Sequence, residues 1–339
     1  MKSLVLRLAV FTALLVSFDH ALAWYGRRSF LSERKIHAAL ARDEGGLLFV
    51  GDSRTVAALS FNVMEERLKQ AGTPIRLVDL TLNSTGIEWH SLAARQIVRA
   101  APKTRGVVLG FAMNRMLRRD LPVDPDLWVG FNSTFYSLIH PDDLDRLYPG
   151  GPLARLDLKL KYYLGHFSSL YRYRSILQYR SDQFRARIIN GERKKKGYNA
   201  FGRIADMEQD GKFVRSSSRE LLLVHKTADG WSMNPWFEHL RSELRRRGIP
   251  LYVVELTVNG ADRLSVADSP EGLAFRTWLS REIDSGGGHF FDMSHVPGIS
   301  DADFPDTIHM DKPASIRFST AFGDELASYF RRHPDLVNR

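Results

Sequence analysis

One serine in this 339-residue chain stands where a nucleophile would be expected. Residues 47–50 are Leu-Leu-Phe-Val, a buried-strand pattern, and Gly51-Asp52-Ser53 follows before an Ala/Leu-rich segment that begins at Val56. Gly51 can take the backbone angles of a tight turn, which other residues resist. Ser53 would then lie at the carboxyl end of a strand and the start of a helix, where open α/β sheets bind ligands. Ser53 is a candidate nucleophile; alternatively, Asp52 or Ser53 only caps the helix.

A serine nucleophile needs a general base, and the base needs an acid that orients it. Asp306 and His309 meet this need in an Asp-x-x-His sequence that directly precedes a helix pattern. The same spacing recurs at Asp292 and His295, where His289 would add a third side chain of a metal-ligating type. Residues 289 and 292 point to opposite faces if they belong to a strand, which disfavours a metal site. We prefer Asp306 and His309 because this pair directly precedes the helix pattern, and we expect neither a metal nor a cofactor.

The segments that must position these residues alternate between strand and helix patterns. Strand patterns occupy residues 47–50, 75–80, 106–110, 249–256 and 289–292. Helix patterns occupy residues 56–70, 88–101, 235–247 (with Asn234 as N-cap), 271–283 and 313–332. Strands separated by helices predict a parallel sheet covered on both faces. The expected fold is a three-layer α/β/α sandwich with roughly five strands, and the helix-leaning residues 117–232 form a helical insertion.

The amino terminus has the pattern of an export segment. Lys2 and Arg7 precede the mainly apolar residues 8–18, and Ala21-Leu22-Ala23 matches the small-x-small site of signal peptidase. We expect a signal peptide at residues 1–23 and an exported domain at residues 24–339, in the periplasm or outside the cell. An uncleaved membrane anchor and a buried amino-terminal helix are the alternatives.

The net charge of +9 is concentrated between Arg172 and Lys196, where aromatic side chains are interleaved. An exported chain rarely meets nucleic acid, so the expected partner of this stretch is an anionic membrane surface or an acidic polysaccharide. A solvated helix face followed by a loop is the alternative. The hydrophobic content of 44% indicates a folded protein that needs no disulfide, and the chain has no cysteine.

The order of these features resembles the SGNH (GDSL-like) hydrolase superfamily. Gly51-Asp52-Ser53 matches the nucleophile block of that family, and Asp306 with His309 matches its last block. Gly86 follows the second strand, as the oxyanion glycine of the family does. The block after the third strand departs from the family pattern, because Asn114 lies four residues past Gly110 and Arg115 replaces the usual Asp.

The resemblance implies a Ser53–His309–Asp306 triad whose oxyanion is held by Gly86 and Asn114, with Asn83 as a further donor candidate. An export segment with a helical insertion is similar to the envelope-facing branch, which includes alginate O-acetylation proteins and the D-alanyl transfer protein of teichoic acid synthesis. The resemblance therefore implies a serine esterase or O-acyltransferase that acts on acyl esters of a cell-envelope or extracellular polysaccharide.

Two other functions stay open at this point. A non-catalytic protein of this fold would assist polysaccharide acylation, and a secreted lipase or lysophospholipase would use the basic stretch to bind membranes. The chain has no Gly-x-Ser-x-Gly, P-loop or His-Glu-x-x-His motif, which argues against three other enzyme classes.

Overall fold

The computed structural model describes residues 2–40, 45–82, 85–101, 103–113, 151–174, 177, 181, 224–227, 230–306 and 308–337. The chain divides into two compact units. One consists of Met1–His37 and Pro122–Phe213, and the other of Ala38–Leu121 and Val214–Arg339.

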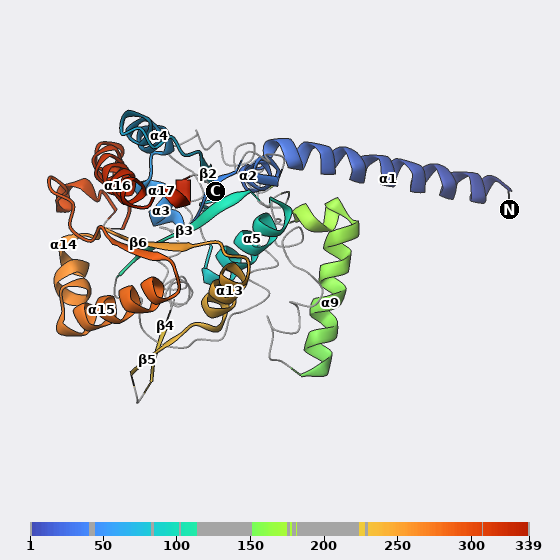
Figure 1. Cartoon of the computed structure of the whole chain (residues 1–339). Helices are drawn as coiled ribbons and strands as arrows, with labels where there is room; N and C mark the ends of the chain where they lie inside the picture. The colour runs from blue at the N-terminus through green and yellow to red at the C-terminus, as the bar shows by residue number, and fades with distance from the viewer. Residues whose placement is uncertain are drawn as a thin grey trace. The chain divides into compact units, whose positions relative to one another are not determined.

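The unit with residues 38–121 and 214–339 is built on a parallel sheet of five strands in the order β2-β1-β3-β6-β7 (Figure 1). The strands are β1 (Gly46–Val50), β2 (Leu77–Asp79), β3 (Thr104–Ala112), β6 (Leu251–Leu256) and β7 (His289–Asp292). Every residue of β1 and β6 is buried, as expected of strands with helices on both faces. The predicted α/β class with a five-stranded parallel sheet is confirmed.

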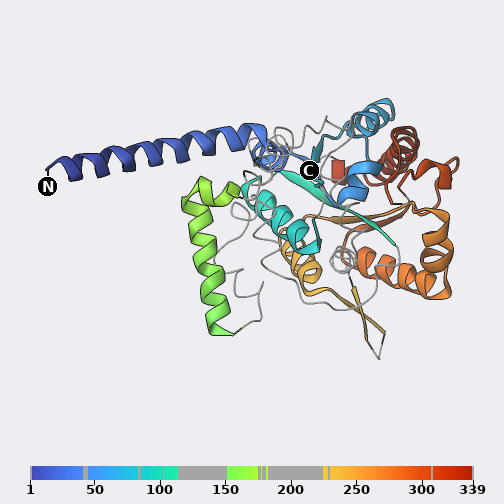
Figure 2. The ribbon, with the colours of Figure 1, turned by 180° about the vertical axis from the view of Figure 1, so that it is seen from behind.

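Helices cover both faces of this sheet (Figures 1 and 2). One face carries α4 (Phe61–Gln70) and α16 (Lys312–Arg332), and the other carries α5 (Ile87–Ala100), α13 (Pro235–Arg246) and α15 (Pro270–Ser285). The side chain of Asn234 caps α13 as predicted, because it accepts the Trp236 N–H at 2.9 Å. The shorter helices of the unit are α3 (Ser53–Ala58), α14 (Gly260–Asp262), the π-helical Arg263–Ala267, the 3₁₀ turn Asp301–Asp303 and α17 (Pro334–Val337).

The single helix predicted over residues 56–70 is wrong, because the chain forms α3 and α4 with a break at Leu59 and Ser60. The hydroxyls of Ser315 and Ser319 on α16 donate to the Ala58 carbonyl at 3.3 and 3.2 Å. The Ser60 N–H in turn donates to the Ser319 hydroxyl at 2.7 Å. Helix α16 thus supplies the partners that the interrupted helix lacks, and local sequence does not show this.

The sequence predicted unusual backbone angles at Gly51, but the structure shows that glycine is needed there because another side chain approaches closely. Gly51 is absent from the described glycines with a positive φ. A Cβ at Gly51 would overlap the Thr55 side chain, and a Cβ at Gly110 would lie 2.5 Å from Thr55 Cγ2. Thr55 is fully buried, and α3 can pack this closely only because Gly51, directly after β1, and Gly110, near the carboxyl end of β3, have no side chain.

The end of the predicted helical insertion is a β-hairpin, which corrects the helical prediction there. Strands β4 (Val224–Thr227) and β5 (Gly230–Met233) pair antiparallel. Elsewhere in residues 117–232, the described parts are α9 (Pro152–Phe167), the helical segment 169–174, and residues 177 and 181.

The unit with residues 1–37 and 122–213 contains α1 (Lys2–Ser29), which is long and apolar enough to cross a membrane, and the start of α2 (Leu31–Leu40). Helix α1 runs without interruption through the Ala21-Leu22-Ala23 sequence. Leu22 is buried in a cluster with Phe30 and Tyr173, and the rings of the last two lie 4.9 Å apart. The expected boundary at residue 23 therefore falls inside a packed helix.

Replacing Gly110 by Ala is expected to lower the free energy of unfolding by about 2 kcal/mol, because the new methyl group overlaps Thr55. Urea unfolding of purified variants measures this loss. Thr55→Ala removes the atoms that a Cβ at Gly110 would meet, so the double variant should lose clearly less than the two single variants summed. If the losses of the two single variants simply add in the double variant, contact with Thr55 is not the reason that position 110 needs glycine.

Candidate functional site

Ser53 lies where strand order reverses in the sheet. β1 has β2 on one side and β3 on the other: the chain passes from β1 outward to β2, then crosses over β1 to β3 on the opposite side. In doubly wound sheets, ligands bind at the carboxyl ends of such strands. Asp52 is the N-cap of α3, because its Oδ1 accepts the N–H groups of Arg54 (3.0 Å) and Thr55 (3.3 Å). Ser53 is then the first residue of α3, and capping does not use its hydroxyl.

The Ser53 hydroxyl lies against His309, although the two are 256 residues apart in the chain, with His309 Nε2 at 2.8 Å from Ser53 Oγ. The other ring nitrogen, Nδ1, lies 2.6 Å from Asp306 Oδ2. A carboxylate only accepts hydrogen bonds, so in the neutral ring the proton sits on Nδ1 and Nε2 accepts the Ser53 O–H. The structure thus brings the three predicted residues together in the order serine, imidazole and carboxylate.

A tight turn holds Asp306 in this position. Its Oδ1 accepts the backbone N–H groups of Ile308 (3.1 Å) and His309 (2.7 Å), while Oδ2 faces the imidazole. Partial burial raises the pKa of the Asp306 carboxyl, but the hydrogen bonds from His309 and Ile308 outweigh burial and the pKa falls below its ordinary value. Asp306 is therefore ionised at neutral pH and able to stabilise a positive charge on His309.

The second Asp-x-x-His sequence does not form such a pair. His295 Nε2 lies 3.0 Å from Asp268, and Asp292 accepts the hydroxyl of Ser294. His289 contacts Asp284 at 3.4 Å instead. Among the described residues, no three acidic or histidine side chains are grouped closely enough to hold a metal ion.

Gly86 is the buried N-cap residue of α5, on the loop that follows β2. That loop runs beside the turn of residues 51–53, named the nucleophile turn after its candidate nucleophile Ser53, because the Leu82 N–H donates to the Gly51 carbonyl at 3.0 Å. The Thr85 hydroxyl then donates to the Leu82 carbonyl at 2.7 Å. Gly86 and Ser53 therefore lie on adjoining loops at the same edge of the sheet. Asn114 and Asn83, the other two oxyanion candidates, lie outside the described residues.

Sequence reasoning missed two buried ionisable residues beside this loop. The His90 ring contacts the Thr85 hydroxyl at 3.0 Å and is hydrogen-bonded to the backbone of Gly51, so it joins α5 to the nucleophile turn. Burial lowers the pKa of His90 to about 4, although the Asp52 charge acts in the opposite direction. Burial also raises the pKa of Glu88, in the first turn of α5, to about 7. In the sequence, only their positions two and four residues after Gly86 could have indicated that Glu88 and His90 lie near the site.

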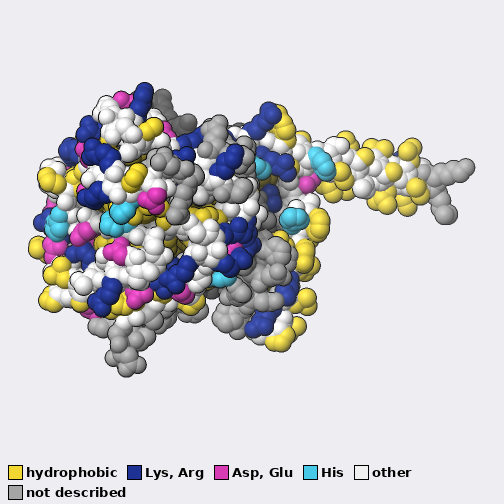
Figure 3. Space-filling view, viewed as in Figure 1, with side chains coloured by type: hydrophobic (Ala, Val, Ile, Leu, Met, Phe, Trp, Pro, Cys, Tyr) yellow, Lys and Arg dark blue, Asp and Glu magenta, His cyan; other side chains and the backbone are white. Residues whose placement is uncertain are grey.

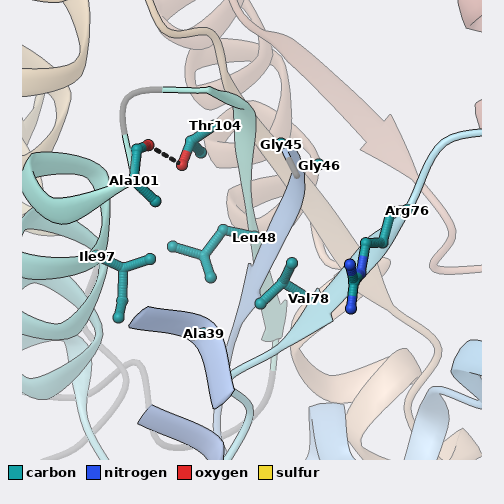
Figure 4. Close-up of a pocket in the computed structure, with 9 residues that line it drawn as sticks. All are labelled: Ala39, Gly45, Gly46, Leu48, Arg76, Val78, Ile97, Ala101 and Thr104. Atoms are coloured by element: carbon teal, nitrogen blue, oxygen red, sulfur yellow. Dashed lines mark hydrogen bonds between the residues drawn. The ribbon is translucent and has the colours of Figure 1, made fainter. Parts of the chain in front are cut away.

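A small cavity in this unit lies at the other end of the sheet. Figure 4 shows that Gly46 and Thr104, at the starts of β1 and β3, line it together with Leu48, Val78 and Ile97. Its lining is mainly apolar and includes none of the three residues at the Ser53 site. The Ser53 hydroxyl lies instead at the opposite, carboxyl edge of the sheet, where the His309 side chain is 17% exposed and Asp306 is 52% exposed.

The basic stretch expected between Arg172 and Lys196 lies mostly outside the described residues. Within the described part, the Arg174 guanidinium stacks on the Tyr171 ring at 3.8 Å, and Arg172 Nε donates to the Gly165 carbonyl at 3.2 Å. These arginines therefore contribute to local packing as well as to charge.

Fold and site together define the chain as a doubly wound α/β protein with a Ser–His–Asp arrangement at its topological switch point. No family model matches the chain, and a search of curated proteins finds no similar sequence.

The buried pair Glu88 and His90 predicts two opposing effects of pH on stability. The raised pKa of Glu88 stabilises the fold at low pH, and this contribution is lost as pH rises from 4.5 to about 7. The lowered pKa of His90 stabilises the fold above pH 6.5, and this contribution is lost as pH falls to about 4. The two effects oppose each other in the wild-type chain.

Glu88→Gln should therefore lose stability on acidification from pH 7 to pH 5, and His90→Gln should gain it, each by roughly 2 kcal/mol. Urea unfolding at the two pH values measures both slopes. The double variant should show neither slope, and equal slopes in the two single variants would contradict this assignment.

Proposed function

We propose that this protein transfers acyl groups from esters through Ser53, either to water or to a sugar hydroxyl. The observation that carries the proposal is the chain of short contacts from Ser53 Oγ to His309 Nε2 (2.8 Å) and from His309 Nδ1 to Asp306 (2.6 Å). A serine with a base and an orienting carboxylate in this geometry is the arrangement of acyl-transfer enzymes.

In the first step, Ser53 Oγ attacks the acyl carbon while His309 Nε2 takes the hydroxyl proton. The resulting imidazolium is stabilised by the Asp306 carboxylate, and its proton passes to the leaving alkoxide as the substrate ester bond breaks. A water or a sugar hydroxyl then attacks the acyl-Ser53 ester, His309 takes its proton, and Ser53 regains a proton as the acyl group leaves.

The oxyanion of the tetrahedral intermediate needs hydrogen-bond donors. Backbone N–H groups at the start of a helix are suited to this role, and two such groups lie on adjoining loops. They belong to Ser53 at the start of α3 and Gly86 at the start of α5. In the resemblance to SGNH hydrolases, Asn114 is the third donor.

The substrate that fits this proposal is an acylated polysaccharide of the cell envelope or the extracellular space. The resemblance to the envelope-facing branch of the SGNH hydrolases supports this substrate class, and so does an amino-terminal helix able to enter a membrane. The basic stretch from Arg172 to Lys196 would favour an acidic polysaccharide or an anionic membrane surface.

We further propose that the chain is exported and that α1 remains attached as an anchor. Cleavage after Ala23 would remove Leu22 from its cluster with Phe30 and Tyr173, which disfavours a cleaved signal peptide.

Ser53→Ala should lower turnover of p-nitrophenyl acetate on the order of 10⁵-fold, and Asp306→Asn on the order of 10³–10⁴-fold. Wild type should take a fluorophosphonate label on Ser53, as read by peptide mass spectrometry. Asp292→Asn is the matched control, because it alters the other Asp-x-x-His sequence, and its turnover should stay within about twofold of wild type. Equal turnover and no labelling in wild type and Ser53→Ala would instead support a non-catalytic protein.

The anchor is tested by the intact mass of the chain expressed in a bacterium that exports it. The expected mass includes residues 1–23, and the protein should stay with the membrane after a carbonate wash. A soluble product that begins at Trp24 would overturn the anchor proposal and leave the triad untouched.

A further inference from the structure

Helix α9 (Pro152–Phe167) carries a continuous apolar stripe that faces solvent. Six large apolar side chains, between 43% and 83% exposed, recur at helical spacing: Leu153, Leu156, Leu160, Tyr163, Leu164 and Phe167. At 3.6 residues per turn they fall on one side of the helix. Exposed single apolar residues are common, but a stripe along a whole helix is typical of a surface that meets another apolar phase.

The stripe is not the side of α9 that packs within the protein. Leu158 and Tyr162 are buried, at 4% and 5% exposure, and they project from a different side of the helix. Arg155, Lys159 and His166 lie along one border of the stripe, between it and the buried side. Helix α9 therefore has a packed side, an apolar outer side and a basic border, which is the pattern of helices that lie in a membrane interface.

Helix α9 belongs to the same compact unit as α1. Hydrogen bonds join the carboxyl end of α9 to α1. The Asp19 carboxylate of α1 accepts the N–H groups of Ser169 and Leu170 at 3.0 and 2.9 Å, and the hydroxyl of Ser168 at 3.0 Å. It thereby caps the helical segment 169–174 directly after α9 ends. A carboxylate in an otherwise apolar helix is thus fully engaged, and α9 is tied to α1 near residue 19.

The position of Asp19 along α1 shows where α9 would lie relative to a membrane, because residue 19 directly follows the apolar residues 8–18. Trp24 and Tyr25 come next and are 58% and 42% exposed, and the Arg28 guanidinium lies 4.3 Å above the Trp24 ring. Exposed aromatic and basic side chains after an apolar segment mark the level of lipid headgroups. The Asp19 contact therefore ties the end of α9 close to that level.

The direction of α9 is consistent with a helix that lies at the level of the lipid headgroups. Helix α9 runs crosswise to α1 in both ribbon views (Figures 1 and 2). In Figure 3, hydrophobic side chains line the margin of α9 on the side toward which the amino-terminal end of α1 extends. A bilayer crossed by α1 would meet that margin along its length.

We propose that α9 is a second membrane element, which lies in the interface with its apolar stripe in the lipid beside the point where α1 enters. This inference rests on the proposed anchoring by α1, and it is independent of the Ser53 chemistry. The partner of the apolar stripe is the lipid surface itself. The stripe contacts acyl chains, and the basic border contacts anionic headgroups.

Single-cysteine labelling tests the proposal in the full chain, which has no cysteine of its own. Leu160→Cys places an environment-sensitive fluorophore on the stripe, and Arg155→Cys places it on exposed surface of the same helix outside the stripe. Leu8→Cys reports on insertion of α1. Each labelled protein is reconstituted in vesicles of phosphatidylcholine and phosphatidylglycerol that carry lipid-borne spin-label quenchers.

The fluorophore at residue 160 should be quenched by lipid about threefold more than the one at residue 155, and shielded from aqueous iodide. Equal lipid quenching at 160 and 155, with the label at 8 quenched, would overturn the proposal while leaving the anchor intact. Shielding at 160 from both quenchers would point to a second copy or another protein on the stripe and would also overturn it. If the label at 8 also escapes lipid quenching, the anchor itself has failed. Near-ultraviolet circular dichroism of each variant verifies folding.

Discussion

The candidate site depends on one set of contacts, the hydrogen bonds between α16 and the break that separates α3 from α4. Ser315 and Ser319 donate to the Ala58 carbonyl, and Ser319 accepts the Ser60 N–H, so the carboxy-terminal helix is fixed to the helix that begins with Ser53. His309 lies just before α16, whose first turn is capped by Asp311. The short contact between His309 and Ser53 is possible because these two helix starts are held together across the fold. Without that junction, His309 and Ser53 would belong to segments with no local reason to meet.

Close packing limits which residue types fit around the nucleophile turn. Gly51 directly follows β1 and Gly110 lies near the carboxyl end of the neighbouring β3, and both leave room for the buried Thr55 side chain of α3. Behind the turn, His90 is held neutral by burial and joins α5 to the Gly51 backbone. Within the triad, the Asp306 carboxylate accepts hydrogen bonds from two backbone N–H groups and from the His309 ring, and these bonds hold its pKa below the ordinary value. This arrangement concentrates negative charge where a developing imidazolium would need it.

In the other compact unit, a single carboxylate has a comparable role. Asp19 would be costly in an apolar helix without partners, and it finds three donors at the start of the segment 169–174. The same contact ties the end of α9 to α1, so the hydrogen bonds of one partly buried carboxylate also help to set where an amphipathic helix lies. In this view the amino-terminal helix is a structural part of the protein.

The five strands, the α/β class and the Asn234 cap could be predicted from the sequence, because periodicity and short motifs are local properties. Short motifs also singled out Ser53, Asp306 and His309 as candidates, which the structure brings together. The sequence did not determine the helix break at Leu59 and Ser60 or the role of Gly51, since both depend on side chains that arrive from distant segments. It favoured Asp306 and His309 over the second Asp-x-x-His pair, but it could not show that this pair faces Ser53. That contact is a tertiary one, because the loop before α16 returns to the carboxyl end of β1, while Asp268 engages His295 elsewhere.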